Sequence, residues 1–212
     1  MEHKIQSRKE EMANALTHGI GVLLAVILVP LLISKAAFNG TPLILFAVTV
    51  FSFGFLMAYL SSTAYHIVSR PKTKKILRVW DHISIFFLIG GTYTPIVLTY
   101  ADYQTAIIFL SIMWLLILGG SVLKIFFTGK YDRTSTAIYI LLGWMAVFII
   151  KPLYANLPID ILGWIVAGGL AYTFGVIFYK WHKLTFQHSI WHLFVLAGTL
   201  FQYIAVYKSV AP

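Results

Sequence analysis

The sequence predicts an all-α membrane protein, a bundle of seven helices that cross the bilayer. Of its 212 residues, 59% are hydrophobic and only 11% are charged, which is about half the charge of an ordinary soluble domain. Such a chain has too few polar residues to cover a surface in water, so lipid is the solvent that fits it. The apolar residues also come in runs near the ~20 residues that a helix needs to cross ~30 Å of hydrocarbon.

Seven such runs follow one another along the chain. They are continuously apolar rather than alternating, which favours helices over the strands of a membrane barrel. No loop is long enough for another domain, so residues 1–212 are expected to form one membrane domain with a polar N-terminal segment, 1–13. The expected crossings are 14–34, 42–65, 83–100, 104–127, 134–150, 159–179 and 189–207. Helix-breaking residues mark the breaks at Asn39–Pro42, Arg70–Lys72, Gly129 and Asn156–Pro158.

The basic residues give the bundle a direction. Of the 16 Lys and Arg residues, all but Lys35, Lys151 and Lys208 fall on the side that holds the N-terminus. Short cytoplasmic loops carry an excess of Lys and Arg, so the N-terminus is expected in the cytoplasm and the C-terminus outside. The polar start of the chain does not resemble a cleaved signal. We expect a multi-pass protein of the plasma membrane.

Charge and cysteine content exclude several kinds of partner and site. The net charge of +9 lies in short loops between apolar segments, which indicates contact with anionic lipid headgroups rather than nucleic acid. The chain has no cysteine, so disulfides and thiolate chemistry are excluded, and a metal site would have to use His, Asp or Glu. Membrane lipids are the expected partners, and the sequence does not indicate an oligomeric state.

Ionisable side chains gather at one predicted end of the bundle. Within a membrane helix such residues are costly, so they are functional candidates by default. Given the direction above, the candidates fall at the cytoplasmic helix ends, and they are His18, His66, Asp81, His82, His188 and His192. A single histidine at a membrane interface is ordinarily an amphipathic side chain of no special role. A functional site is favoured because these ionisable residues all lie at one depth in the membrane.

The spacing of these residues predicts a metal site. His188 and His192 stand four residues apart, so on a helix they share one face and two imidazoles can bind one ion. Ser62 precedes His66 by one helical turn. Three histidines with an open fourth position form a recognised catalytic zinc arrangement. Imidazole also suits copper or nickel, and Zn²⁺ is favoured for a hydrolytic site without redox chemistry.

At these residues the sequence resembles the hemolysin III family, a bacterial branch of the progestin and adipoQ receptor family in the alkaline-ceramidase-like superfamily. The resemblance covers nearly the whole chain. Three motifs carry it: Glu11–His18, which matches E-x-x-N-x-x-T-H; Ser62-x-x-x-His66 followed by Asp81; and His188-x-x-x-His192.

The resemblance implies a seven-helix bundle with a cytoplasmic N-terminus and a zinc ion held by His66, His188 and His192. It also implies that Asp81 contacts the water at the zinc and that Ser62 lines the site. Receptor members of the family have Tyr after the Asp, where this chain has His82, and a longer connection before it. These departures argue against a receptor role and leave the metal site unaffected.

Three functions remain open from the sequence. The first is an intramembrane zinc hydrolase of lipid amides, or a regulator of membrane lipid homeostasis, with Asp81 and Ser62 as catalytic groups. The second is a pore-forming cytolysin, against which the near absence of polar residues at mid-depth argues. The third is a non-catalytic membrane sensor with structural zinc, in which Asp81 or His82 would have to supply the fourth ligand directly.

Overall fold

The computed structural model describes residues 6–210, and for Asp132 and Arg133 it describes the backbone alone. Residues 1–5, which include Lys4 and part of the expected N-terminal segment, lie outside the described part, as do residues 211 and 212. Within that part every regular element is helical, and seven helical segments are long and apolar enough to cross a membrane. The predicted all-α fold with seven apolar crossings is confirmed.

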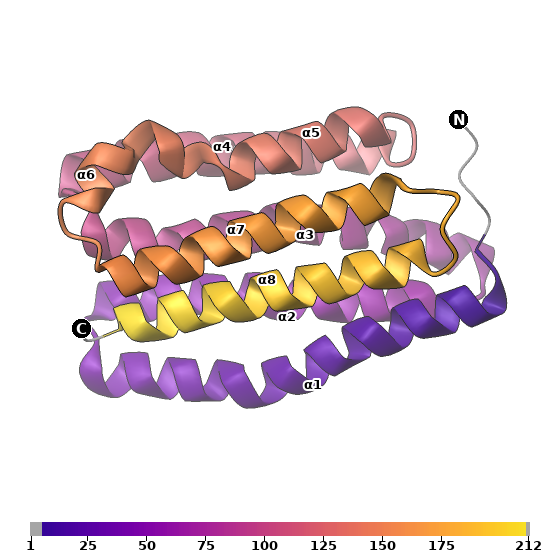
Figure 1. Ribbon diagram of the computed structural model, residues 1–212, viewed down its shortest axis with the longest axis horizontal. Helices are drawn as coiled ribbons and strands as arrows, with labels where there is room; N and C mark the ends of the chain where they lie inside the picture. Colours follow the sequence, from indigo (N-terminus) through magenta and orange to yellow (C-terminus); the bar gives the residue numbers. More distant parts are fainter. Residues whose placement is uncertain (1–5, 211–212) are drawn as a thin grey trace.

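The helices run lengthwise beside one another and connect through short turns (Figure 1). The fifth crossing is divided into three pieces, and each of the others is one helix. In chain order the elements are α1 (Arg8–Asn39), α2 (Pro42–Ile67), α3 (Pro71–Tyr100), α4 (Tyr103–Phe127), α5 (Asp132–Gly143), a 3-10 helix (Met145–Ile149), α6 (Ile150–Tyr154), α7 (Ile159–Lys180) and α8 (Gln187–Ser209).

Local sequence fixes where the helices begin. Ser7 and Glu10 form a capping box at the start of α1, in which the Ser7 amide donates to the Glu10 carboxylate at 2.9 Å. Asp102 precedes α4 and accepts a hydrogen bond from the Thr105 amide at 3.0 Å, which lowers the pKa of the Asp102 carboxyl from its ordinary value. Proline stands at the first position of α2 and α3, where its missing N–H costs nothing.

Two helices extend beyond the apolar runs that predicted them. The helix α1 begins at Arg8 rather than near residue 14, and α3 begins at Pro71 rather than near residue 83. Hydropathy marks only the stretch that suits lipid, whereas helical hydrogen bonding continues through the polar residues beside it. Lys74 ties the early part of α3 to the end of α2, because its Nζ donates to the carbonyl oxygen of Tyr65 at 3.0 Å.

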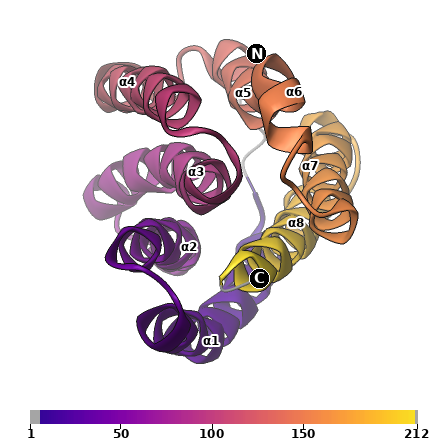
Figure 2. The same cartoon turned by 90° about the vertical axis from the view of Figure 1, so that its left-hand side faces the viewer.

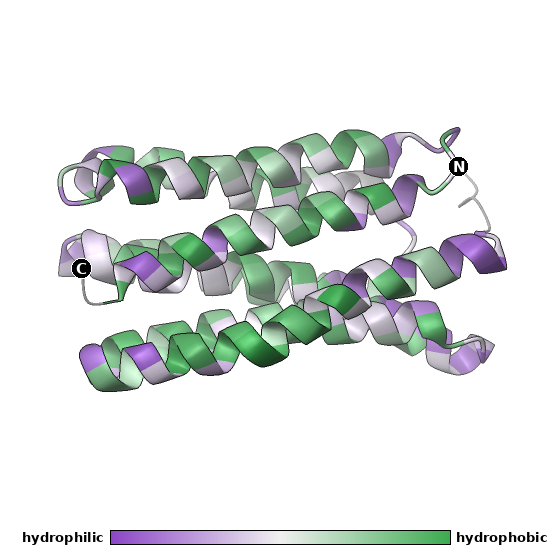
Figure 3. Ribbon diagram, turned by 60° about the horizontal axis from the view of Figure 1, so that its bottom comes forward, coloured by the Kyte–Doolittle hydropathy of each residue, from purple (hydrophilic) through white to green (hydrophobic). Residues whose placement is uncertain are grey.

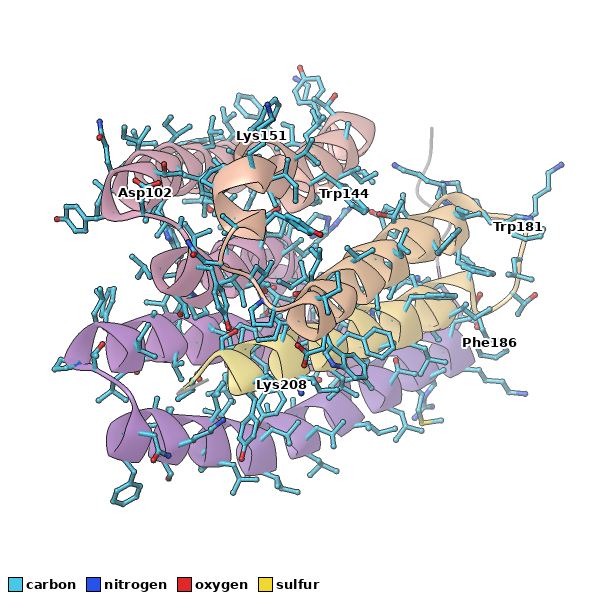
Figure 4. All side chains as sticks on the ribbon, turned by 60° about the vertical axis from the view of Figure 1, so that its left-hand side comes forward. Asp102, Trp144, Lys151, Trp181, Phe186 and Lys208 are labelled. Atoms are coloured by element: carbon cyan, nitrogen blue, oxygen red, sulfur yellow. The ribbon has the colours of Figure 1, made fainter. Side chains whose placement is uncertain are left out.

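The fifth crossing breaks at Trp144, which the sequence had not predicted. The hydroxyl of Tyr93 donates to the carbonyl oxygen of Gly143 at 2.7 Å and accepts from the amide of Ala146 at 3.1 Å. This side chain replaces helical hydrogen bonds at the break, which is one of the known causes of a sharp kink. Trp144 lies at this break (Figure 4), and its indole donates to Oγ1 of Thr173 on α7 at 3.0 Å.

Seen along the bundle, the crossings form a ring (Figure 2). The helix α1 packs against α2 and α8, and α3 packs against α2, α4 and α8. Close approach of α2 and α3 depends on glycine: a Cβ on Gly54 would stand 2.6 Å from the carbonyl oxygen of Phe87, and one on Gly91 would stand 3.0 Å from Cα of Phe51. Small residues at such crossings are the usual packing device of membrane helices.

The outside and the two ends of the bundle differ in polarity. Apolar residues cover the middle of the helices and polar residues gather at the ends (Figure 3). Large apolar side chains such as Leu115, which is 70% exposed, face outward, as a lipid-facing surface requires. We call the end at which α1 begins and α2 ends the basic end. At the opposite end Lys35 donates to the carbonyl oxygen of Tyr207 at 2.7 Å, and Lys208 pairs with Asp160 at 2.9 Å.

Candidate metal centre

Three histidines meet at the basic end of the bundle. His66 comes from the last turn of α2, and His188 and His192 come from the first turns of α8. One ring nitrogen of each lies within 4.8 Å of the others. The ring centroids of His188 and His192 are 4.5 Å apart, and His66 lies 5.2 Å from His192. The structure thus brings together the three residues that the sequence selected, and we call them the histidine cluster.

Glu11 of α1 orients the first of these rings. Its Oε2 lies 2.7 Å from Nδ1 of His66, and its Oε1 lies 3.1 Å from Nζ of Lys74. A carboxylate can only accept, so the proton of this hydrogen bond belongs to Nδ1. In a neutral imidazole the lone pair is then on Nε2. That Nε2 is buried and has no hydrogen-bond partner among the described residues.

The backbone of α1 orients a second ring. Nδ1 of His192 lies 3.2 Å from the carbonyl oxygen of Asn14 and 3.1 Å from Oγ1 of Thr17. Because a carbonyl oxygen only accepts, Nδ1 of His192 is the donor, and in a neutral ring its lone pair is on Nε2. The Asn14 side chain in turn accepts from the hydroxyl of Ser189 at 2.6 Å, which fixes α8 against α1 between the two histidines of its motif.

These hydrogen bonds fit the requirements of a metal ion. Metal-ligating histidines almost always donate their other ring N–H to a carboxylate or a carbonyl oxygen, which sets the tautomer and aims the lone pair. His66 and His192 each show one of these two arrangements. A buried nitrogen without a partner, such as Nε2 of His66, costs free energy unless something binds it. The cluster therefore suits a divalent ion that prefers imidazole.

His18 adds a fourth imidazole beside the cluster. Its ring stacks on that of His192, with the ring centroids 3.5 Å apart. The centroid of the Tyr59 ring lies 4.9 Å from that of His18. Both of its nitrogens are buried and lack hydrogen-bond partners among the described residues. His18 is not part of the group whose ligand atoms converge within 4.8 Å, so it lies beside the cluster.

A cavity of about 260 Å³ opens beside the cluster and continues between the helices. Ser62, Asp81 and His82 line it together with His188 and His192. The hydroxyl of Ser62 is buried without a hydrogen-bond partner in the described structure. Asp81 is not one of the converging ligands, and its carboxylate lies 3.7 Å from Nδ1 of His82. Both candidate catalytic residues thus face the space next to the histidines without belonging to the cluster.

The turn before α8 holds its backbone in an unusual conformation. Phe186 has a φ of 58°, in the left-handed region that residues other than glycine seldom adopt. Such a residue costs on the order of 1–3 kcal/mol and persists only where its surroundings enforce it. Its carbonyl oxygen accepts from the amide of Ile190 at 3.0 Å, so it fixes the start of α8 two residues before His188. Trp181 and Phe186 both belong to the connection between α7 and α8 at the basic end (Figure 4).

The sequence reasoning missed the roles of Glu11, Asn14 and Thr17. It used them only as parts of a motif that carried a resemblance. Their spacing of three residues was a usable signal, because positions three and four apart share one face of a helix. That face of α1 meets α2 and α8 at the cluster.

Comparisons with known proteins agree with these features. The family model described as haemolysin-III related matches residues 6–203. The chain is 41% identical over 212 residues to Hemolysin-3 of Bacillus cereus, covering 100% of this chain and 97% of that protein. It is 43% identical over 198 residues to the Hemolysin-3 homolog of Bacillus subtilis (strain 168), covering 93% of each.

A more distant relative is the human monocyte to macrophage differentiation factor, with 27% identity over 165 residues, which covers 75% of this chain and 68% of that protein. No solved structure gives a significant match. The extent of the family match and the identity to the two Bacillus proteins lead to one conclusion: this chain is a multi-pass membrane protein that belongs to the haemolysin-III related family.

Proposed function

We propose that this protein is a zinc-dependent hydrolase of lipid amides that works inside the membrane. One observation supports this above all: three converging histidines, two with their tautomers set by α1, border a cavity that Asp81 and Ser62 also line. Catalytic zinc sites keep three protein ligands and an open position. We favour zinc over copper or nickel because hydrolysis needs no redox chemistry.

Each side chain has a distinct task in this proposal. His66, His188 and His192 hold the ion. Bound zinc supplies Lewis acidity and lowers the pKa of a water molecule to about 7. Asp81 accepts the proton of the attacking water, and the hydroxyl of Ser62 donates to the carbonyl oxygen as negative charge develops there.

The reaction is the addition of water across an amide bond. The water oxygen bonds to the carbonyl carbon, the carbon–nitrogen bond breaks, and the nitrogen leaves with a proton as an amine. The products are a fatty acid and an amine. An amide with a long acyl chain suits the site because aliphatic side chains line most of the cavity away from the histidines.

The site belongs to the inner leaflet if the basic end faces the cytoplasm. The excess of Lys and Arg at that end supports this orientation and an insertion into the plasma membrane. Substrate would then enter from the cytoplasmic leaflet.

The structural-zinc alternative rests on His18. Its imidazole stacks on His192, and both of its nitrogens are buried without a hydrogen-bond partner in the described structure. A closed four-coordinate site would need such a fourth ligand. Such a protein would regulate membrane lipids without hydrolysing them. The cytolysin alternative takes its support from the name of the Bacillus cereus relative, Hemolysin-3, while the aliphatic part of the cavity gives no polar path for an aqueous pore.

A lipid-amide assay separates these functions. Purified protein is incubated with a panel of lipid amides, with and without a chelator, and released fatty acid is measured. Hydrolysis predicts release that the chelator abolishes and that Asp81→Asn abolishes while zinc is retained. Loss of zinc in His18→Ala, with no release by the wild type, favours the structural role.

A further inference from the structure

Gln202 is a polar exception in the apolar part of the cavity. Away from the histidine cluster the lining is largely aliphatic, with Ile96, Leu153, Leu162 and Ile165 among its members. Gln202 of α8 lines the same cavity and is 5% exposed. Its Nε2 donates to the carbonyl oxygen of Ile165 at 3.0 Å, and its Oε1 has no hydrogen-bond partner among the described residues. A buried amide thus keeps an unused acceptor next to the cavity.

Neighbouring polar groups on the cavity wall do not share this feature. The hydroxyl of Thr173 donates to the carbonyl oxygen of Gly169 at 2.8 Å, and the indole of Trp144 donates to Thr173 at 3.0 Å. The backbone also makes room for Gln202: a Cβ on Gly168 would collide with its Nε2. A buried acceptor without a hydrogen bond costs free energy, and an apolar side chain of the same shape would avoid that cost. The amide at Gln202 therefore points to a ligand that carries a hydrogen-bond donor.

The position of Gln202 relates it to a lipid chain. It follows His192 by ten residues on α8, which places it about 15 Å further along the helix at 1.5 Å per residue. That distance is about half of the ~30 Å hydrocarbon core, or the depth of one leaflet. The cavity also exceeds the roughly 10–15 Å³ that one water molecule needs. A chain whose head lies at the histidines can reach Gln202.

We propose that Gln202 recognises a hydroxyl group on the acyl chain of the lipid in this cavity. A hydroxyl both donates and accepts. It can donate to Oε1 and accept from the second hydrogen of Nε2, since one of the two is used by Ile165. The inference rests on the proposed function in one respect, namely that the cavity takes an acyl chain with its head at the histidine cluster. The preferred substrates are then lipid amides whose acyl chain carries a hydroxyl group.

Binding of fatty acids with a single hydroxyl tests this without any catalytic step. The hydroxyl is moved along a chain of fixed length, and each isomer and the plain fatty acid are titrated into the purified full chain in detergent. Trp144 and Trp191 line the cavity, so tryptophan fluorescence reports binding. Affinity should peak for the isomer whose hydroxyl reaches about 15 Å from the head, by about three- to tenfold over the plain fatty acid, as one hydrogen bond allows.

Two variants make the test specific. Gln202→Leu should lose the peak and still bind the plain fatty acid, which also shows that the variant is folded. Tyr203→Phe is the matched control, because it removes a hydrogen bond to the Leu28 carbonyl oxygen at the adjacent position of α8, away from the cavity, and should keep the peak.

Equal binding of all isomers and the plain fatty acid would overturn only the claim that Gln202 recognises a hydroxyl group. The amide of Gln202 would then hold a bound water molecule instead. The same holds for a peak that survives in Gln202→Leu. Failure of every fatty acid to bind would overturn the proposed lipid guest as well, so the two failures are distinct.

Discussion

Nδ1 of His66 lies 2.7 Å from Oε2 of Glu11, so a carboxylate on the first helix orients a ring on the second. If the cluster binds zinc, this hydrogen bond sets the tautomer of a ligand. Glu11→Gln keeps the size of the side chain and removes its charge. We expect it to weaken zinc binding by about 10- to 100-fold, the usual effect of changing such a partner. Competition with a chelator of known affinity measures it.

The control for that variant is its neighbour. Glu10→Gln changes a carboxylate that caps α1 through Ser7 and is not part of the group of converging ligands. Its zinc affinity should stay that of the wild type. Equal losses in the two variants would mean that the start of α1, rather than the Glu11–His66 contact, controls binding.

The hydroxyl of Tyr93 holds the break in the fifth crossing. Tyr93→Phe leaves the carbonyl oxygen of Gly143 and the amide of Ala146 without this partner, and lipid offers no water to replace it. We expect the free energy of unfolding in mixed micelles to fall by about 1–3 kcal/mol. Tyr103→Phe, at a residue that is 78% exposed, should change it by less than about 0.5 kcal/mol. Similar values for both would show that the break does not depend on Tyr93.

The orientation can be tested because the chain has no cysteine. Lys72 at the basic end and Gln104 at the opposite end are both exposed near helix starts. In intact cells a membrane-impermeant maleimide should modify Gln104→Cys at once and Lys72→Cys only after the membrane is permeabilised. The reverse pattern would place the basic end outside and contradict the positive-inside assignment.

The sequence predicted the crossings better than the helices themselves. Hydropathy located all seven apolar segments, because transfer into lipid depends on composition over a long window. It could not show that α3 begins at Pro71, since the polar residues there join the helix outside the apolar run. Nor could it show the break at Trp144, which depends on a hydroxyl from α3, a contact between residues 50 positions apart.

The same distinction applies to the site. His188 and His192 were predictable because their spacing on one helix is local, and the depth of His66 followed from the topology. The pairing of Glu11 with His66 was not predictable from local rules, because it joins residues 55 positions apart and requires the packing of α1 on α2. Gln202 gave no signal in the sequence either, since its unused acceptor is a property of the folded cavity.

Metal analysis of the purified protein tests the central claim most directly. We expect about one zinc ion per chain for a three-histidine site, and its loss in the His188→Ala/His192→Ala double variant. His182→Ala, at an exposed position outside the cluster, should keep the metal. An unchanged metal content in the double variant would contradict the site, and so would a wild-type protein that binds no zinc when it is supplied.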